Sequence, residues 1–458
     1  MAKQAAPVQK NDYIDLTFVD LTHEGNGVGK IDGYPVFVPY GLPGEKAKVK
    51  IVKVKKNLAF GKLVELIEES EDRIEPPCDV FYKCGGCQIQ HMTYERQLKM
   101  KQKQVQDVMH KIAHMPDVPV HPVIGMEDPW RYRNKIQVPV GKRDGKVITG
   151  FYQQRSHHII DMDTCPVLNE GADEVFREIR DIIDELGIEP YDEENHRGVI
   201  RHIVVREGYH TGELMVVLVT RTKDIPKKNE LIERIRNINP NIKGVVQNLN
   251  PNRTSVIMGK ESKTIWGEDV IIDKIGDLEF AISAHSFYQV NPEQTEKLYQ
   301  KALDFAKLSG SETVIDAYCG IGSISLFLAQ HAKKVYGVEV VPQAVDNAKD
   351  NAKRNHIDNA EFYVGQAEKV MPWWRSQGLR PDVIVVDPPR KGLEEELIQA
   401  MIDMKPDRIV YVSCNPSTLA RDLKQFADGG YVTKQVQPVD MFPQSSHIES
   451  VTELVWQV

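Results

Sequence analysis

The side chains best suited to take part in a reaction are a cysteine and three carboxylates in the C-terminal third of the chain. Asp387, Asp316 and Glu339 each come directly after a short apolar run, and Cys414 follows another with only Ser413 between them. Because parallel strands end at one edge of their sheet, these side chains are expected to converge on a single crevice. A thiol in such a crevice is a candidate nucleophile, whereas a lone buried cysteine more often only fills space.

A glycine turn at residues 317–322 follows Asp316 and opens an apolar helical segment. Strand, tight turn and helix in this order are typical of a nucleotide-type site. Ser325 occupies the place of the third glycine of a dinucleotide fingerprint, which disfavours a bound pyrophosphate. Glu339 ends the next strand, 17 residues after Gly322, where a carboxylate can bind ribose hydroxyls. S-adenosylmethionine (SAM), which has ribose and adenine but no phosphate, fits this pattern better than NAD.

A thiol and a methyl donor at one site indicate a particular target, the C5 carbon of a pyrimidine. Amines and hydroxyls are already nucleophiles, but C5 becomes one only after a thiolate has added to C6. A base must then remove the C5 proton so that the thiol can leave. The residues Phe442-Pro-Gln-Ser-Ser-His447-Ile-Glu449 offer two candidates for this base, His447 and Glu449.

Four of the six cysteines have the spacing of metal ligands. Cys78, Cys84 and Cys87 lie within ten residues, and Cys165 is a distant fourth in Asp163-Thr-Cys-Pro. Four thiolates can hold either a [4Fe-4S] cluster or a tetrahedral zinc ion. Zinc ribbons usually repeat a close cysteine pair, and the single pair here favours iron–sulfur. Four ligands fill all four iron positions, so the cluster is expected to be structural.

The elements that must position these residues fall into three stretches. Residues 8–67 read as short strands that are broken by glycine turns, which predicts a small β-barrel. The stretch 130–284 is strand-like, with helices expected near 173–186 and 229–237, and a further helix is expected over 93–114. From Phe287 onward strands alternate with helical segments, which predicts an open and mostly parallel α/β sheet.

Charge is distributed unevenly along the chain. The net charge is −8, which on average argues against a nucleic-acid-binding protein. Between Pro43 and Leu63, however, there are seven lysines and one glutamate, a local charge of +6. These lysines either bind the phosphate backbone of a nucleic acid or form the solvated face of a strand. The stretch from Trp130 to Lys135 interleaves aromatics with cations, which suits an RNA strand or, again, a solvated face.

Other classes of protein are disfavoured by composition. No apolar run approaches the roughly 18 residues needed to span a bilayer, and Met1-Ala-Lys-Gln precedes no apolar segment of a secretory signal. Six cysteines among 458 residues are too few for a disulfide scaffold. We therefore expect a soluble, cytoplasmic protein.

Taken together, these residues resemble the RNA uracil-C5 methyltransferase family over nearly the whole chain. The motifs that carry the resemblance are Phe287-Tyr-Gln-Val-Asn, Asp316-Ala-Tyr-Cys-Gly-Ile-Gly, Asp387-Pro-Pro-Arg-Lys-Gly, Val412-Ser-Cys-Asn-Pro and His447-Ile-Glu449. The resemblance implies Cys414 as the nucleophile and Glu449 as the base. It also implies that four residues line the SAM and target site: Gln289, Tyr318, Glu339 and Asp387. The glycine turn adds Gly320 and Gly322 to this site. The family often has asparagine at the position of Ser323.

The resemblance also implies a domain plan. Residues 8–67 look like a TRAM domain, an OB-like RNA-binding barrel, and residues 68–285 like a β-rich central domain with a [4Fe-4S] cluster. Residues 286–458 look like a Rossmann-like, SAM-dependent methyltransferase domain. The cluster ligands would be Cys78, Cys84, Cys87 and Cys165.

TRAM and cluster together point to enzymes that form 5-methyluridine in 23S ribosomal RNA. The expected partner is therefore RNA, not DNA or a membrane, and the expected state is a monomer. Three alternatives stay open: a tRNA substrate, a cytosine-C5 methyltransferase and an iron–sulfur RNA-binding protein without activity. The cytosine alternative is weakened because Ser413, and not proline, precedes Cys414.

Overall fold

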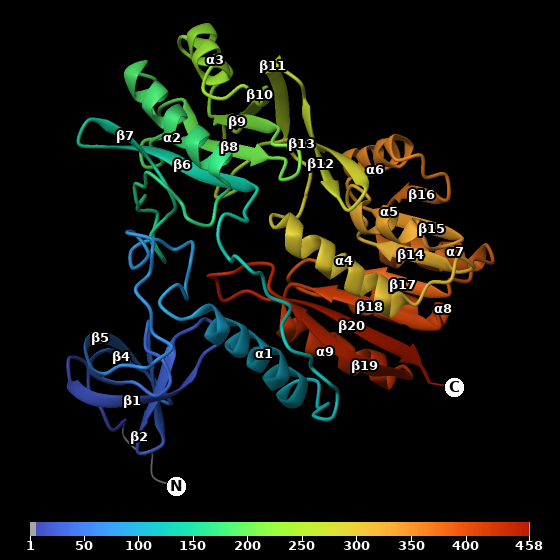
Figure 1. The fold of residues 1–458 in the computed structure, drawn as a ribbon, viewed down its shortest axis with the longest axis horizontal. Coiled ribbons are helices and arrows are strands. Elements are labelled where there is room, and N and C mark those ends of the chain that lie inside the picture. The colour runs from blue at the N-terminus through green and yellow to red at the C-terminus, as the bar shows by residue number, and fades with distance from the viewer. Residues whose placement is uncertain (1–5, 458) are drawn as a thin grey trace.

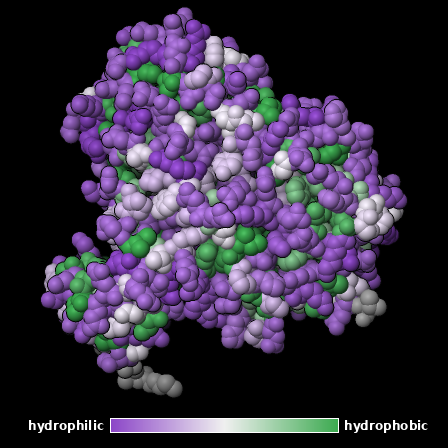
Figure 2. All heavy atoms as spheres, viewed as in Figure 1, coloured by the Kyte–Doolittle hydropathy of each residue, from purple (hydrophilic) through white to green (hydrophobic). Residues whose placement is uncertain are grey.

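The computed structural model describes residues 6–457 and divides them into three parts (Figure 1). In the view of Figure 1 a small barrel, drawn in blue, lies below a central sheet in green, and a larger C-terminal sheet in orange and red lies on the right. Within the described residues, no helix is both long and apolar enough to cross a membrane. Figure 2 shows that the face seen in Figure 1 is largely hydrophilic, with a hydrophobic patch near its centre.

The N-terminal part is a closed five-stranded barrel, as the sequence predicts, with strand order β1-β2-β3-β5-β4. The alternation of apolar and polar residues along β4 explains the barrel. Ala47, Val49 and Ile51 point inward, whereas Lys48, between the first two, is exposed. Gly29 lets the strands close, because a Cβ there would lie 2.4 Å from the Leu16 side chain. The barrel strands are β1 (Tyr13–Leu21), β2 (Gly27–Ile31), β3 (Tyr34–Val38), β4 (Lys46–Val54) and β5 (Ala59–Glu68).

A single long helix, α1 (Tyr94–Lys111), follows the cysteine-rich segment. The Thr93 hydroxyl caps it by accepting a hydrogen bond from the Arg96 amide at 3.4 Å. In Figure 1, α1 lies between the barrel and the C-terminal sheet, and its apolar side packs on helix α9 (Pro416–Asp428) and strand β19 (Tyr431–Val439). The helix thereby ties the first third of the chain to the last.

The central part is a six-stranded sheet of order β11-β10-β9-β8-β6-β7 with two helices, both near their predicted positions. The helices bury their apolar sides against one face of the sheet. On the other face lies a two-stranded hairpin, β12 (Val270–Ile275) and β13 (Leu278–Ser283), which shares its core with the C-terminal part. The elements are β6 (Lys135–Arg143), β7 (Lys146–Thr149), α2 (Glu170–Glu185), β8 (Ile200–Glu207), β9 (Leu214–Thr220), α3 (Lys228–Arg236), β10 (Ile242–Leu249) and β11 (Glu261–Gly267).

The C-terminal part is an open seven-stranded sheet of order β16-β15-β14-β17-β18-β20-β19. Five strands are parallel, and β20 runs antiparallel between β18 and β19, so the predicted α/β class is confirmed. The remaining strands are β14 (Thr313–Ala317), β15 (Lys334–Glu339), β16 (Ala360–Val364), β17 (Val383–Val386), β18 (Arg408–Ser413) and β20 (Glu449–Trp456). The remaining helices are α4 (Pro292–Ala306), α5 (Ser323–Ala329), α6 (Pro342–Arg354), α7 (Ala367–Ser376) and α8 (Glu395–Met404).

Candidate active site

Four neighbouring strands of the C-terminal sheet end in the residues that the sequence singled out. In the parallel register Ala317 pairs with Val338 on one side and with Val386 on the other. Val386 in turn pairs with Tyr411 of β18. Tyr318, Glu339 and Asp387 directly follow these paired residues, and Asp316 directly precedes Ala317. Cys414 follows the last residue of β18, three positions after Tyr411. The predicted convergence on one edge of the sheet is therefore confirmed.

The turn after β14 adopts a backbone that only a few residues tolerate. Tyr318, Gly320 and Gly322 have φ angles of 71°, 53° and 84°, all in the left-handed region. Gly322 is doubly constrained, because a Cβ there would lie 3.1 Å from both Ala348 and Phe362. Gly320 has no heavy atom within 4 Å of such a Cβ, so its backbone faces open space. A ligand can therefore approach the turn closely at Gly320.

Glu339 is held in place by this turn. Its two carboxylate oxygens accept hydrogen bonds from the backbone amides of Gly320 at 3.2 Å and Val341 at 3.0 Å. A carboxylate can accept about four hydrogen bonds, so acceptor capacity is left for hydroxyl groups of a ligand. The carboxylate is thus oriented before any ligand binds.

Asp316 lies beneath the turn with one oxygen unpartnered. It is 1% exposed, and its Oδ2 accepts a hydrogen bond from the Ser325 hydroxyl at 2.5 Å. Oδ1 has no partner, and burial raises the pKa of this carboxyl to about 7. A buried acceptor of this kind is costly unless a donor reaches it, which suits a ligand with a polar or cationic group.

The antiparallel pairing of β18 with β20 brings Cys414 and Glu449 together. Ser413 pairs with Ser450, so the next positions in this register are Cys414 and Glu449. Glu449 is 3% exposed, and its Oε2 has no hydrogen-bond partner. His447, the other candidate base, has an exposed side chain two residues earlier.

The electrostatics of this edge favour uncharged groups in the absence of a cation. Burial, Glu449 and Asp387 raise the pKa of the Cys414 thiol to about 12, and Arg390 opposes this shift. Burial also raises the pKa of Asp387 to about 7, and burial together with Asp387 raises that of Glu449 well above its usual range. A bound cation would stabilise all three ionised forms.

Arg390 was not predicted as a site residue, although it belongs to the quoted Asp387-Pro-Pro-Arg motif. Its backbone oxygen accepts hydrogen bonds from the Asn415 amide at 3.0 Å and the Thr418 hydroxyl at 3.3 Å. These bonds join the loop after Asp387 to the loop after Cys414, so the two strand ends are held as one unit.

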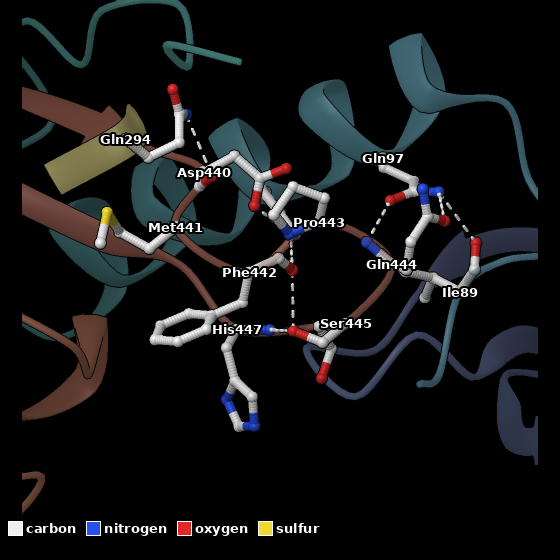
Figure 3. A network of polar contacts seen from close by, with 12 residues as sticks. Ile89, Gln97, Gln294, Asp440, Met441, Phe442, Pro443, Gln444, Ser445 and His447 are labelled. Carbon is white, nitrogen blue, oxygen red and sulfur yellow. Dashed lines mark hydrogen bonds and ion pairs between the residues drawn. The ribbon is translucent and has the colours of Figure 1, made fainter. Parts of the chain in front are cut away.

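The segment 440–448, which leads into Glu449, is anchored by α1 (Figure 3). Lys101 and Asp440 are both fully buried and form an ion pair of 2.5 Å. The Gln97 side chain donates a hydrogen bond to Gln444 Oε1 at 2.9 Å and accepts one from the Gln444 amide at 3.0 Å. Sequence reasoning missed these residues, because α1 and this segment lie more than 300 positions apart.

We expect Lys101→Met to destabilise the protein by about 3–5 kcal/mol, because it leaves the Asp440 carboxylate buried without its partner. Urea unfolding followed by circular dichroism measures this change. Lys99→Met is the matched control on the same helix, since Lys99 pairs with Glu95 on the surface and both side chains are exposed. Equal stability of the two variants would show that the buried pair does not hold this segment.

The four proposed ligand cysteines line one cavity of about 280 Å³. Burial raises the pKa of the Cys87 and Cys165 thiols to about 12, and the Gly86 amide donates a hydrogen bond to Cys84 Sγ at 3.3 Å. Within residues 6–457, however, no three His, Cys, Asp or Glu side chains are placed to hold a single metal ion. The cavity also reaches Arg390 and His447.

Two residues of the stretch from Trp130 to Lys135 make hydrogen bonds within the protein that its composition does not indicate. Arg131 donates hydrogen bonds to the Cys165 backbone oxygen at 3.1 Å and to the Asp173 carboxylate at 3.0 Å, which fixes the loop around Cys165. Tyr132 is buried, and its hydroxyl donates to the Pro443 oxygen at 2.9 Å. The interleaving of aromatics and cations therefore does not by itself mark an RNA-binding face.

Three residues of the quoted family pattern remain to be placed: the predicted site residue Gln289, and Ser323 and Phe287. Gln289 is buried in the loop between β13 and α4, where its backbone oxygen accepts a hydrogen bond from the Asn134 side chain at 3.0 Å. Ser323 shares a hydrogen bond of 2.8 Å with the hydroxyl of Tyr299 from α4. Phe287, by contrast, is 70% exposed and is not a core aromatic.

Comparisons with known proteins agree with this geometry. The profile of the tRNA (Uracil-5-)-methyltransferase family matches residues 93–456, and that of the TRAM domain matches residues 7–64. An uncharacterized RNA methyltransferase of Halalkalibacterium halodurans is 62% identical over 454 residues, which cover 99% of each chain. Another from Oceanobacillus iheyensis is 60% identical over 455 residues, also with 99% coverage of each.

Among the solved structures similar to this chain is one that matches it over almost its full length. It is the tRNA (uracil-54, C5)-methyltransferase of Pyrococcus abyssi in complex with S-adenosyl-L-homocysteine. The two structures superpose with a TM-score of 0.78 at 28% sequence identity, covering 96% of this chain and 99% of the other. The chain therefore belongs to the tRNA (Uracil-5-)-methyltransferase family and is a SAM-dependent RNA methyltransferase with an N-terminal TRAM domain.

Proposed function

We propose that the protein methylates uridine at C5 in 23S ribosomal RNA, with Cys414 as the nucleophile and Glu449 as the base. The observation that carries this proposal is the strand register that sets Glu449 opposite Cys414 at the carboxylate-rich edge of the sheet. A thiol and an unpartnered buried carboxylate at one site are the two groups that C5 methylation requires.

In this mechanism the Cys414 thiolate adds to C6 of the uracil, and the electron pair of the C5–C6 bond makes C5 nucleophilic. C5 then takes a methyl group, which bound SAM would supply, with the neutral thioether S-adenosylhomocysteine as the leaving group. Glu449 removes the remaining C5 proton, the C5–C6 double bond re-forms, and the bond between C6 and Cys414 Sγ breaks to release the thiolate. Because C5 and C6 of a stacked base are covered, the uridine must first leave the stack.

Several residues of the chain fit SAM, which supplies a methyl group on a positively charged sulfur when bound. The oriented carboxylate of Glu339 has capacity for ribose hydroxyls, and the backbone at Gly320 is open to close approach. The unpartnered oxygen of Asp316 suits a donor or a cation. We assign Gln289, Tyr318, Gly322 and Asp387 to the same site.

The choice of ribosomal RNA over tRNA depends on the TRAM domain together with the cysteine set. Mapping 5-methyluridine in 23S rRNA and in tRNA, from cells with and without this protein, tests that choice. Loss of 5-methyluridine from rRNA alone supports the proposal, and loss from tRNA alone would assign the enzyme to tRNA.

We further propose that Cys78, Cys84, Cys87 and Cys165 hold a [4Fe-4S] cluster. Thiolates that bind four different irons surround a volume and do not converge on one point, which matches a shared cavity without a single-ion site. Free thiols with a pKa near 12 would stay protonated, whereas iron binding deprotonates them.

Anaerobically purified protein is expected to be brown, to absorb in the blue-violet and to contain iron and sulfide in equal amounts. Cys87→Ser should remove the colour because it removes one of four ligands, whereas Cys319→Ala should keep it, since Cys319 is buried in the glycine turn. Visible absorption and iron analysis give the result. A colourless wild-type protein with stoichiometric zinc would refute the cluster.

We expect the covalent step to accelerate as the pH rises from 6 to 8, because the Cys414 thiol must lose a proton and because burial and the neighbouring carboxylates raise its pKa. Rapid mixing of the SAM-bound enzyme with saturating 5-fluorouridine RNA measures the rate of adduct formation. A rate that is independent of pH would mean that the thiol is already ionised before the RNA binds.

A further inference from the structure

Two cations face each other on the central sheet without an acidic partner. Lys135 of β6 pairs directly with Arg206 of β8 in the antiparallel register, so both side chains lie on the same face of the sheet. Arg133 lies on the same side, and its Nε donates a hydrogen bond to the Lys135 backbone oxygen at 2.9 Å. Among the ion pairs of residues 6–457, none involves any of these three.

Burial makes this arrangement unfavourable in the free protein. Arg206 is only 7% exposed and its Nε has no hydrogen-bond partner. Burial, Arg206 and Arg133 together lower the pKa of Lys135 to about 7. A cation is rarely buried beside other cations unless an anion neutralises them for part of the functional cycle.

The cations border the loop that joins the central sheet to the methyltransferase sheet. Arg206 Nη2 donates hydrogen bonds to the backbone oxygens of Ser286 at 2.6 Å and Ala284 at 3.3 Å. The next residue is Phe287, an exposed aromatic, and Gln289 of the same loop is bound by Asn134, the neighbour of Lys135. Phe287 therefore follows a residue that Arg206 holds, and an exposed aromatic together with cations is typical of sites that stack a base and neutralise its phosphate.

We propose that Lys135 and Arg206, with Arg133 beside them, bind a backbone phosphate of the substrate RNA next to the target uridine. This inference rests on the proposed function and names the part of the substrate that the central domain holds. A guanidinium beside an ammonium offers several donors to one phosphate. The competing anion is the carboxylate of SAM, but the cations belong to β6 and β8 and not to the methyltransferase sheet.

The test compares Lys135→Gln with Lys146→Gln, a loss of the same charge at an exposed position of the neighbouring strand β7. Binding of a fluorescent single-stranded oligouridine is measured by anisotropy at several salt concentrations. We expect Lys135→Gln to weaken binding about tenfold and to reduce the slope of log K against log salt by about 0.7, the value for one phosphate contact on a single strand. Lys146→Gln should behave like the wild type.

Two further measurements distinguish the alternatives. Lys135→Arg should restore RNA affinity if charge is what matters, and calorimetry should give unchanged SAM affinity for Lys135→Gln. If Lys135→Gln lost SAM affinity and kept the RNA salt slope, the cations would belong to the SAM carboxylate and the proposal would be wrong. If Lys135→Gln and Lys146→Gln had equal slopes, it would also be wrong. Because binding is measured without turnover, these results are independent of whether C5 methylation is confirmed.

Discussion

Cys414→Ala is expected to reduce methyl transfer by at least about 10⁴-fold, the order of loss seen when the nucleophile of covalent catalysis is removed. Without the thiol, C5 of the uracil cannot become nucleophilic, and the carboxylates of the site cannot replace it. Single-turnover transfer of a labelled methyl group to RNA measures the effect.

RNA affinity should stay within about twofold of the wild type, because the thiol contributes chemistry and little contact area. Cys319→Ala serves as the control, since it removes a second thiol near the same edge of the sheet and should retain most of the activity. A Cys414→Ala enzyme that kept a tenth or more of the wild-type rate would exclude covalent catalysis at this position.

Glu449→Gln is expected to stop the reaction later, after the methyl group has been transferred. The thiolate can still add to C6, because loss of the Glu449 charge removes one of the causes that raise the pKa of Cys414. The C5 proton cannot be removed by an amide, so methylated RNA should stay bound to the protein. Turnover should fall by about 10²–10⁴-fold, the range for general base catalysis.

A denaturing gel with ordinary uridine RNA detects the trapped species, and mass spectrometry shows whether the methyl group is present. His447→Gln is the control, since the sequence alone leaves His447 and Glu449 as alternative bases. Its side chain is exposed, and it should release product at nearly the wild-type rate. If His447→Gln traps the RNA and Glu449→Gln does not, the roles are reversed.

The site residues at the edge of the sheet could be predicted from the sequence because each strand end is recognisable from a few neighbouring residues. Each run of apolar residues ends in a polar residue, and parallel strands bring such ends together whatever their order. Asp316, Glu339, Asp387 and Cys414 therefore share one edge, as expected. The glycine turn could be predicted in the same way, and Gly322 there has a left-handed backbone and little room for a side chain.

The position of the base could not be predicted from pattern alone. Strands that follow one another in sequence often lie side by side, which would place β19 next to β18. Instead, β20 enters between them and runs antiparallel, and only this register sets Glu449 opposite Cys414. From the residues alone, His447 and Glu449 were indistinguishable for this reason.

Polar contacts between residues far apart in the chain could not be predicted from the sequence either. The ion pair between Lys101 and Asp440 spans 339 positions, and a lysine on a helix usually faces solvent. Arg131 is a second case, because its cationic neighbourhood in the sequence does not reveal that its side chain binds the loop around Cys165. In both cases a contact with a distant part of the chain, which the sequence does not reveal, decides what the charge does.

The covalent intermediate is the central feature of the proposed mechanism, and trapping it is the decisive test. RNA that carries 5-fluorouridine at the target position, incubated with the intact protein and SAM, should form an adduct that survives denaturation, because fluorine at C5 cannot be removed as a proton can. Peptide mass spectrometry should place the RNA on Cys414. Absence of any adduct, or its attachment to another residue, would contradict the mechanism.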